Sequence, residues 1–277
     1  MRTKLQSKAL GSHVLLIIAS IIMGYPLLWL IFGSLKSQSG FFLNFWLPPL
    51  HWAWGNYLIA WTTGHLSIAY LNSIIITSTT IVLAIIIAFL AGYVMSRYQF
   101  SGKLLVYGLL ILPLIVPLQV TYIALYKLEL TLGLYDTRIG LIAAYTASGI
   151  SIPTLVFLSF FNTLSRDLDE AASLDGSTLF GIMWRIILPL SKPAFATSII
   201  LTFLGVWNDY LTALILITNP NRWTIPLAMT YFNQEFAGVN YVHVFAAIAM
   251  SIVPIILIFI TFQRMFISGI TEGALKL

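Results

Sequence analysis

The sequence predicts an all-α, polytopic membrane protein with six transmembrane helices. Hydrophobic residues fill 59% of the 277 positions and charged residues only 8%, whereas a soluble domain carries about 25% charged residues. Six continuously apolar segments reach the roughly 20 residues that a helix needs to cross a hydrocarbon core. Because these segments show no period of two, and backbone groups in lipid must bond within their own segment, we expect helices and not β-barrel strands.

The first apolar segment follows a basic stretch and therefore also resembles a signal peptide. The run from Val14 to Phe32 is longer than the usual ~7–15 residues of a signal peptide's apolar region, and no clear cleavage site follows it. We therefore expect a retained helix. The six spans are expected near residues 14–35, 70–96, 104–126, 139–161, 194–217 and 244–264.

The basic residues predict the orientation of the chain. They lie at the ends of the apolar runs and do not form a stripe, so the net charge of +5 does not indicate a nucleic-acid partner. If the N-terminus is inside, ten of the 14 basic residues fall on the inner side. The four on the outer side are Lys36, Lys127, Arg138 and Arg222. The positive-inside rule then predicts that both termini are cytoplasmic.

The residues with metal or thiol chemistry are few. The chain has no cysteine, which excludes disulfides and thiol catalysis, and its four histidines lie far apart without the spacing of metal ligands. We expect no metal site. The predicted outer segment 36–69 is rich in tryptophan and proline. Such a segment is typical of an interfacial aromatic belt, and a docking surface for an external partner is the alternative.

The predicted inner loop 162–193 contains two short helices. Asp167, followed by Glu170 three residues on, favours a capping box at the first helix. Asp175-Gly176 indicates a turn or C-cap. Ser177 or Thr178 is expected to cap the second helix, and Pro189 to end it. The second helix gains an apolar face from residues at three- and four-residue spacing, namely Leu179, Ile182, Met183 and Ile186.

The same loop resembles the EAA loop of bacterial ABC importer permeases. Glu170-Ala171-Ala172 is followed after three residues by Gly176, and after nine more by Ile186-Ile187-Leu188-Pro189. The resemblance implies a coupling helix that sits in a cleft of an ATP-hydrolysing subunit. The alternative is that Glu170 only caps a helix and Gly176 only makes a turn. The candidate coupling residues are Glu170, Ala171, Ala172, Asp175, Gly176, Ile186, Leu188 and Pro189.

The resemblance extends from about residue 70 to the end of the chain. Asn72-Ser73, the stretch 113–141 and Trp207-Asn208-Asp209 are similar to segments of carbohydrate permeases. The chain is most similar to the shorter, six-helix membrane subunit of maltose-type importers. This implies a type I ABC importer permease fold and a sugar or oligosaccharide as cargo. It also implies a bacterial or archaeal plasma (inner) membrane.

The resemblance also implies partners and a domain plan. The expected partners are membrane lipid, a homologous second permease, two ATP-hydrolysing subunits and an external solute-binding protein, which the loop 218–243 contacts. The expected domains are an N-terminal helix with an external loop (1–69), a transmembrane core (70–264) and a cytoplasmic tail (265–277).

One acid and two helix breakers are candidates for the solute pathway. Asp209 lies well inside an apolar run, and a charge there should face protein or water. Trp207 and Asn208 precede it in the chain. The alternative interpretation is that Asn208 and Asp209 form a polar pair that packs helices together. Gly149 and Pro153 lie near the middle of the fourth span. A break there could shape a cavity, although a simple kink is equally expected.

The chain itself is not expected to bind nucleotide. Gly102-Lys103 is the nearest fragment of a phosphate loop, but Leu104 follows it and Arg97 replaces the first glycine. We expect no cofactor on this chain, with ATP and Mg²⁺ on the partner subunits. The alternative function is an ion-coupled secondary transporter. That class usually contains repeats and midplane ionisable residues, and here only Asp209 is a candidate.

Overall fold

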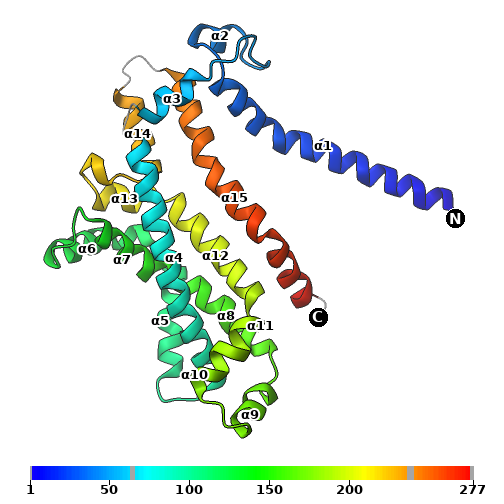
Figure 1. The fold of residues 1–277 in the computed structure, drawn as a ribbon, viewed down its shortest axis with the longest axis vertical. Coiled ribbons are helices and arrows are strands. Elements are labelled where there is room, and N and C mark those ends of the chain that lie inside the picture. Colours follow the sequence, from blue (N-terminus) through cyan, green and yellow to red (C-terminus); the bar gives the residue numbers. More distant parts are fainter. Residues whose placement is uncertain (1, 63–65, 236–239, 275–277) are drawn as a thin grey trace. The chain divides into compact units, whose positions relative to one another are not determined.

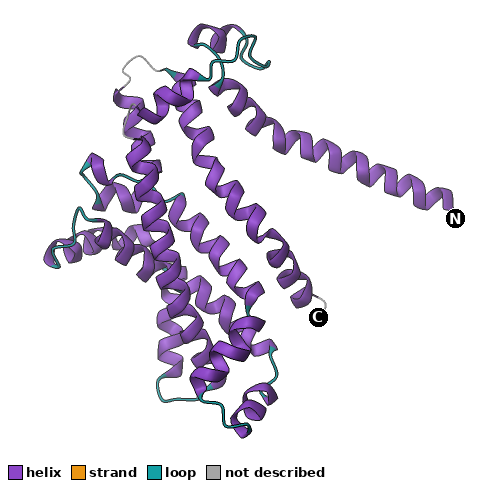
Figure 2. Ribbon diagram, viewed as in Figure 1, coloured by secondary structure: helices purple, strands orange, loops and turns teal. Residues whose placement is uncertain are grey.

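The computed structural model describes residues 2–62, 66–235 and 240–274. All regular secondary structure within these ranges is helical (Figures 1 and 2). The predicted all-α fold class is therefore confirmed.

Single helices supply three of the candidate membrane spans in the described ranges. They are Ser12–Ser34 within α1 (Arg2–Ser34), α4 (Leu66–Arg97) and Tyr241–Met265 within α15 (Tyr241–Ala274). The last helix continues through Pro254 without a break.

Bent helix pairs supply the other three candidate spans in the same ranges. Lys103–Ile115 (α5) meets Leu118–Thr131 (α6) at 107°, and Arg138–Gly149 (α7) meets Ser151–Thr163 (α8) at 41°. Leu179–Leu190 meets Lys192–Trp207 (α12) at 76°. Counting each pair as one span gives up to six, which agrees with the prediction.

Three of the expected spans are not continuous helices, and one of them is the segment 139–161, which bends by 41° between α7 and α8. The predicted segment 104–126 is broken at Val116, which is extended (φ −87°, ψ 118°) before Pro117. Proline disfavours the helical conformation of the residue before it and lacks an N–H of its own. The predicted segment 194–217 is also broken, because α12 ends at Trp207 and α13 (Leu211–Leu216) begins after three residues.

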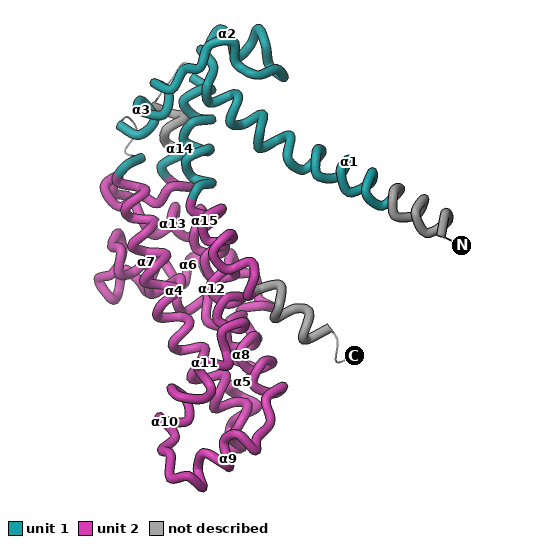
Figure 3. Tube along the Cα trace, turned by 45° about the vertical axis from the view of Figure 1, so that its right-hand side comes forward, with its two compact units in different colours: residues 1–67, 228–253 teal, residues 68–227, 254–277 magenta. Residues whose placement is uncertain are grey.

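The chain folds into two compact units, which Figure 3 distinguishes by colour. The first contains residues 1–67 and 228–253, and the second contains residues 68–227 and 254–277. The predicted division into 1–69, 70–264 and 265–277 remains a prediction.

Aromatic packing holds the first unit together. Its short helices are α2 (Gln38–Leu43) and α3 (Gly55–Thr62). The ring of Phe41 contacts Trp29, Phe45, Tyr241 and Phe245. Lys36 is 2% exposed and donates hydrogen bonds from Nζ to the carbonyls of Asn44 and Phe45. Burial lowers the pKa of this amine.

Two apolar clusters organise the second unit. One joins α4, α8 and α12 to the loop 162–193, through buried residues such as Phe89, Phe157 and Ile187. The other joins α4 and α7 to the residues after α12, through Ile76, Leu141 and Leu216 among others. This second cluster extends to Leu227 at the start of α14 (Ile225–Glu235), which follows the short helix η2 (Pro220–Arg222).

Candidate functional site

The first half of the loop is the helix α9 (Asp167–Leu174). Asp167 is its first residue and not its cap, since Arg166 supplies the carbonyl that accepts from the N–H groups of Asp169 and Glu170. The expected capping box was therefore wrong. The hydroxyl of Ser165 instead accepts a hydrogen bond from the N–H of Asp167, at 3.2 Å.

A glycine cap ends this helix, as predicted. Gly176 has a φ of +80°. Its N–H donates to the carbonyl of Ser173, and the N–H of Ser177 donates to the carbonyl of Ala172. This pair of hydrogen bonds satisfies carbonyls at the end of a helix and needs a left-handed residue, for which glycine is best suited.

The second half of the loop is one helical stretch in three parts, α10 (Leu179–Ile182), η1 (Met183–Ile187) and α11 (Leu188–Leu190). The hydroxyl of Thr178 caps this stretch by accepting a hydrogen bond from the N–H of Gly181. Of the two predicted caps, Ser177 and Thr178, the structure thus selects Thr178. Pro189 does not end the helix, contrary to expectation. The preceding π-helical turn widens the backbone where proline would otherwise clash with the carbonyl four residues earlier.

One face of the loop, its inner side, is buried against the membrane helices, and the opposite face, its outer side, is exposed. Ala172, Ile182, Met183 and Ile187 are buried in the first apolar cluster of the second unit. Leu174, Phe180 and Trp184 are 89%, 68% and 53% exposed. The rings of Phe180 and Trp184 contact each other edge to face, with centroids 5.7 Å apart. The outer side is therefore an apolar surface next to the glycine turn.

The candidate coupling residues divide between these two sides. Glu170, Ala171, Asp175, Gly176 and Pro189 are exposed. Ile186 and Leu188 are partly buried against the first apolar cluster, and Ala172 is buried within it. The structure thus places Glu170, Ala171, Asp175, Gly176 and Pro189 of the motif outward, and Ala172, Ile186 and Leu188 toward the membrane helices.

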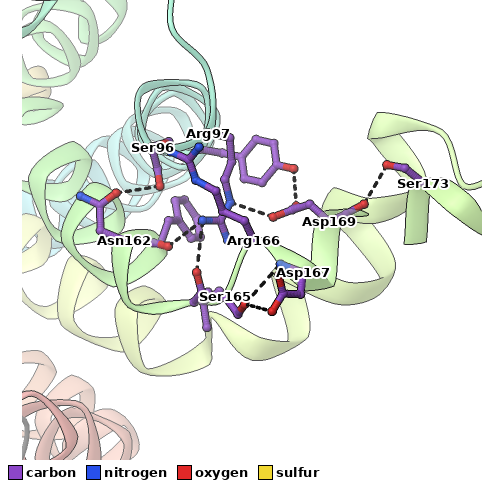
Figure 4. A network of polar contacts seen from close by, with 11 residues as sticks. Ser96, Arg97, Asn162, Ser165, Arg166, Asp167, Asp169 and Ser173 are labelled. Atoms are coloured by element: carbon purple, nitrogen blue, oxygen red, sulfur yellow. Dashed lines mark hydrogen bonds and ion pairs between the residues drawn. The ribbon is translucent and has the colours of Figure 1, made fainter. Parts of the chain in front are cut away.

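A polar network joins α9 to the end of α4 (Figure 4). The Arg97 guanidinium lies 2.8 Å from a carboxylate oxygen of Asp169, and these side chains are only 7% and 18% exposed. The Tyr93 hydroxyl donates to the other oxygen of Asp169, at 2.7 Å. Arg97 also donates to the carbonyls of Phe161 and Leu164 at the end of α8. One arginine thus ties three helices together.

Neighbouring residues reinforce this junction. The guanidinium of Arg166 donates to the carbonyl of Ser96, at 3.3 Å. The hydroxyl of Ser96 donates to the amide oxygen of Asn162, at 2.9 Å. The start of α9 is therefore attached to α4 by a side chain, and α4 is attached in turn to α8.

A cavity of about 490 Å³ lies within the second unit. Gly149, Pro153 and Asp209, three of the candidate pathway residues, line it. Trp207 does not: it is 3% exposed, and its ring packs on Phe203. Asn208 is exposed and donates to the carbonyl of Leu204. The sequence motif Trp-Asn-Asp thus contributes only its acid to the cavity lining.

Asp209 also caps α13. Its carboxylate accepts hydrogen bonds from the N–H groups of Thr212 and Ala213, from the hydroxyl of Thr212 and from the hydroxyl of Tyr145, at 2.8 to 3.3 Å. The interpretations of Asp209 as a pathway residue and as a packing residue are therefore compatible.

Several polar contacts between distant segments were not expected. Asn72 donates to the carbonyls of Asn221 and Trp223, and Ser73 accepts from the N–H of Ile225. Asp136, with a φ of 55°, accepts from the backbone of residues 218 and 219 and pairs with Arg222. A buried polar residue in an apolar run is a visible signal, but the sequence does not identify its partner.

Metal ligation has no candidate in the described part of the chain. No three histidine or acidic side chains there lie close enough together to hold an ion.

Comparison with known proteins identifies the family. Residues 81–272 match the family model described as binding-protein-dependent transport system inner membrane component. The probable ABC transporter permease protein YurM of Bacillus subtilis is 36% identical over 268 residues, covering 95% of this chain and 87% of that protein.

Two further similarities concern a relative and a solved structure. The trehalose/maltose transport system permease protein MalG of Thermococcus litoralis is 32% identical, covering 95% of this chain and 97% of that protein. A chain in the crystal structure of a bacterial ABC transporter involved in the import of alginate has the same fold, with a TM-score of 0.81 and 24% identity. That match covers 94% of this chain and 97% of the other. The chain is a multi-pass membrane protein that belongs to the family of binding-protein-dependent transport system inner membrane components.

Proposed function

We propose that this chain is the permease subunit of an ATP-driven importer whose cargo is a sugar or a short oligosaccharide. Relatives that share 30–33% of their residues with this chain carry the names of transport systems for trehalose/maltose, arabinooligosaccharides and sulfoquinovosyl glycerol. The chain covers more than nine tenths of each of these relatives. The breadth of these names supports a carbohydrate cargo and leaves the particular sugar open.

The loop 162–193 is the contact with an ATP-hydrolysing subunit. The observation that carries this role is its division into an exposed apolar tip and a buried inner side. Leu174, Phe180 and Trp184 are exposed at the tip, and an apolar surface beside a short helix can fill a groove in a partner. Arg97 of α4 holds α9 through its ion pair with Asp169 and donates hydrogen bonds to carbonyls at the end of α8. Force applied at the tip therefore reaches the membrane helices.

The transport cycle follows from this contact. Two partner subunits bind ATP with Mg²⁺ and close, the loop moves with them, and the attached helices rotate as rigid bodies. A second permease completes the pathway, and an external binding protein delivers the solute. With the N- and C-termini inside, the loop faces the cytoplasm, where ATP is available. The ion-coupled alternative lacks a comparable supporting observation.

The glycine cap provides the test. Gly176→Pro cannot adopt the φ of +80° found at this position, because proline fixes φ near −65°. We expect normal membrane insertion, continued ATP hydrolysis and a fall in solute uptake of at least about tenfold, which corresponds to roughly 1.4 kcal/mol of lost coupling. The measurement is ATP hydrolysis and uptake in proteoliposomes that contain the complete transporter.

Gly181→Ala is the matched control. A Cβ atom at Gly181 would approach the Thr178 hydroxyl no closer than 3.4 Å, which is an ordinary contact. This variant should transport as the parent does. Normal uptake by Gly176→Pro would exclude the loop as the coupling element.

A further inference from the structure

We propose that the cavity in the second unit is a contact site for a neutral saccharide, so that this subunit itself touches the cargo. This inference rests on the proposed function and adds to it the charge class of the cargo and the residues that contact it. Four observations on the cavity support it: its position, its unpaired hydroxyl, its charge and its walls.

The cavity lies where broken helices converge. Its lining includes Val116 at the break between α5 and α6, Gly149 at the bend between α7 and α8, and Asp209 between α12 and α13. Irregular backbone at membrane depth is tolerated where it lines a water-filled cavity, and discontinuous helices form the solute sites of many transporters. The volume of about 490 Å³ falls within the roughly 300–1,000 Å³ of small-molecule sites.

One buried hydroxyl in the lining has no hydrogen-bond partner among the described residues. Thr202 on α12 is 7% exposed, and its Oγ1 makes no hydrogen bond with the described part of the chain. A buried hydroxyl without a partner costs free energy, about 1–3 kcal/mol. A polyhydroxylated ligand in the cavity would supply that partner, because each sugar hydroxyl can both donate and accept.

The charge of the lining favours binding of neutral sugars over anionic ones. Asp209 is the only acidic residue among the described residues that line the cavity, and no lysine, arginine or histidine is among them. An anionic sugar would place a second negative charge near this carboxylate without a cation to compensate it, which is unfavourable in a partly desolvated site. The lining therefore suits a neutral sugar.

The remaining walls suit a sugar ring. Ser148 and Thr121 donate their hydroxyl protons to backbone carbonyls, which leaves oxygen lone pairs free to accept from a ligand. Tyr145, which is held by its hydrogen bond to Asp209, is the aromatic residue of the lining. Apolar side chains such as Leu201 and Ile152 can pack against the C–H faces of the ring.

The experiment compares two isosteric substitutions in the complete transporter. Thr202→Val removes the hydroxyl in the cavity. Thr146→Val removes another buried hydroxyl without a hydrogen-bond partner among the described residues, which does not line the cavity. Both should leave thermal stability unchanged or raise it, because an unsatisfied group is lost. Only Thr202→Val should weaken equilibrium binding of tritiated sugar, about threefold to tenfold, to the complex of both permeases and the ATP-hydrolysing subunits prepared without the external binding protein.

The probes are trehalose, maltose and melibiose as neutral sugars, and sulfoquinovosyl glycerol as an anionic one. The parent transporter should bind a neutral probe more tightly. Asp209→Asn keeps the size and capping ability of the side chain and should improve the relative binding of the anionic probe.

Equal effects of Thr202→Val and Thr146→Val, or preference of the parent for the anionic probe, would overturn this inference and leave ATP-driven import intact. ATP-dependent uptake of none of the sugars would instead contradict the proposed function.

Discussion

At the scale of single residues, the junction of Arg97 and Asp169 matters most for the proposed coupling. Asp169 directly precedes Glu170 of the exposed motif, and its carboxylate is held by Arg97 and Tyr93 of α4. A buried ion pair contributes little net stability, but loss of one member leaves an uncompensated charge. The pair therefore fixes the position of α9 on α4, and we expect it to move with both helices as one body.

A pair of variants tests this junction. Arg97→Met should lower the free energy of unfolding by about 3–5 kcal/mol, because Asp169 then keeps a buried charge with only the hydrogen bond from Tyr93. The double variant Arg97→Met with Asp169→Leu should lose clearly less, because no unpaired charge remains. The measurement is chemical unfolding of the purified subunit in detergent. Asp169→Leu alone completes the cycle, and a double variant whose loss equals the sum of the two single losses would show that the residues are not coupled.

The sequence could not predict this junction. Arg97 counts as a topology signal at the end of a span, and Asp169 as an acid in the first turn of a helix. Their pairing depends on how α4 and α9 pack, which no local pattern encodes. The same holds for Asn72, whose partners are carbonyls of Asn221 and Trp223.

At the scale of elements, two of the three caps predicted in the loop 162–193 were confirmed and the one at Asp167 was wrong, whereas helix breaks were harder to predict. The caps at Gly176 and Thr178 follow from local chemistry that acts within a few residues. Proline was harder to interpret, since Pro117 begins α6 after a break while Pro113 and Pro254 lie inside helices. Pro153 is the third residue of α8, in a first turn that tolerates proline. Whether a proline breaks a helix depends on neighbours that satisfy the freed carbonyls.

Helix packing in the second unit depends on one close approach. A Cβ atom at Gly92 of α4 would lie 2.8 Å from Cβ of Phe157 and 3.1 Å from the backbone nitrogen of Leu158, both on α8. Gly92→Ala should therefore force the helices apart and lower stability by about 1–3 kcal/mol. The measurement is the thermal unfolding midpoint of the purified subunit.

The control for this prediction is Gly108→Ala in α5. A Cβ atom at Gly108 meets nothing within 4 Å, and alanine favours helix over glycine by about 1 kcal/mol. This control should be neutral or stabilising. A Gly92→Ala variant as stable as the control would contradict the close packing of α4 and α8.

At the scale of the whole molecule, hydropathy predicted the architecture well. Six apolar runs predicted six spans, and the structure gives three helices and three bent pairs within its described residues. The physical reason is that lipid imposes length and composition on each span independently of its neighbours. The cavity could not be predicted in the same way. It is formed by residues from three separate bends, and only the folded chain brings them together.

The central claim is that the exposed tip of the loop 162–193 contacts an ATP-hydrolysing subunit. The chain has no cysteine, so a single introduced cysteine can carry a photoreactive benzophenone group. Phe180→Cys places it at the tip, where Phe180 is 68% exposed, and Leu50→Cys places it in the predicted outer segment, where Leu50 is 82% exposed.

After illumination of membranes that contain the complete transporter, we predict a covalent adduct with the ATP-hydrolysing subunit from position 180 and none from position 50. Absence of that adduct from position 180, or an equal yield from both positions, would contradict the account.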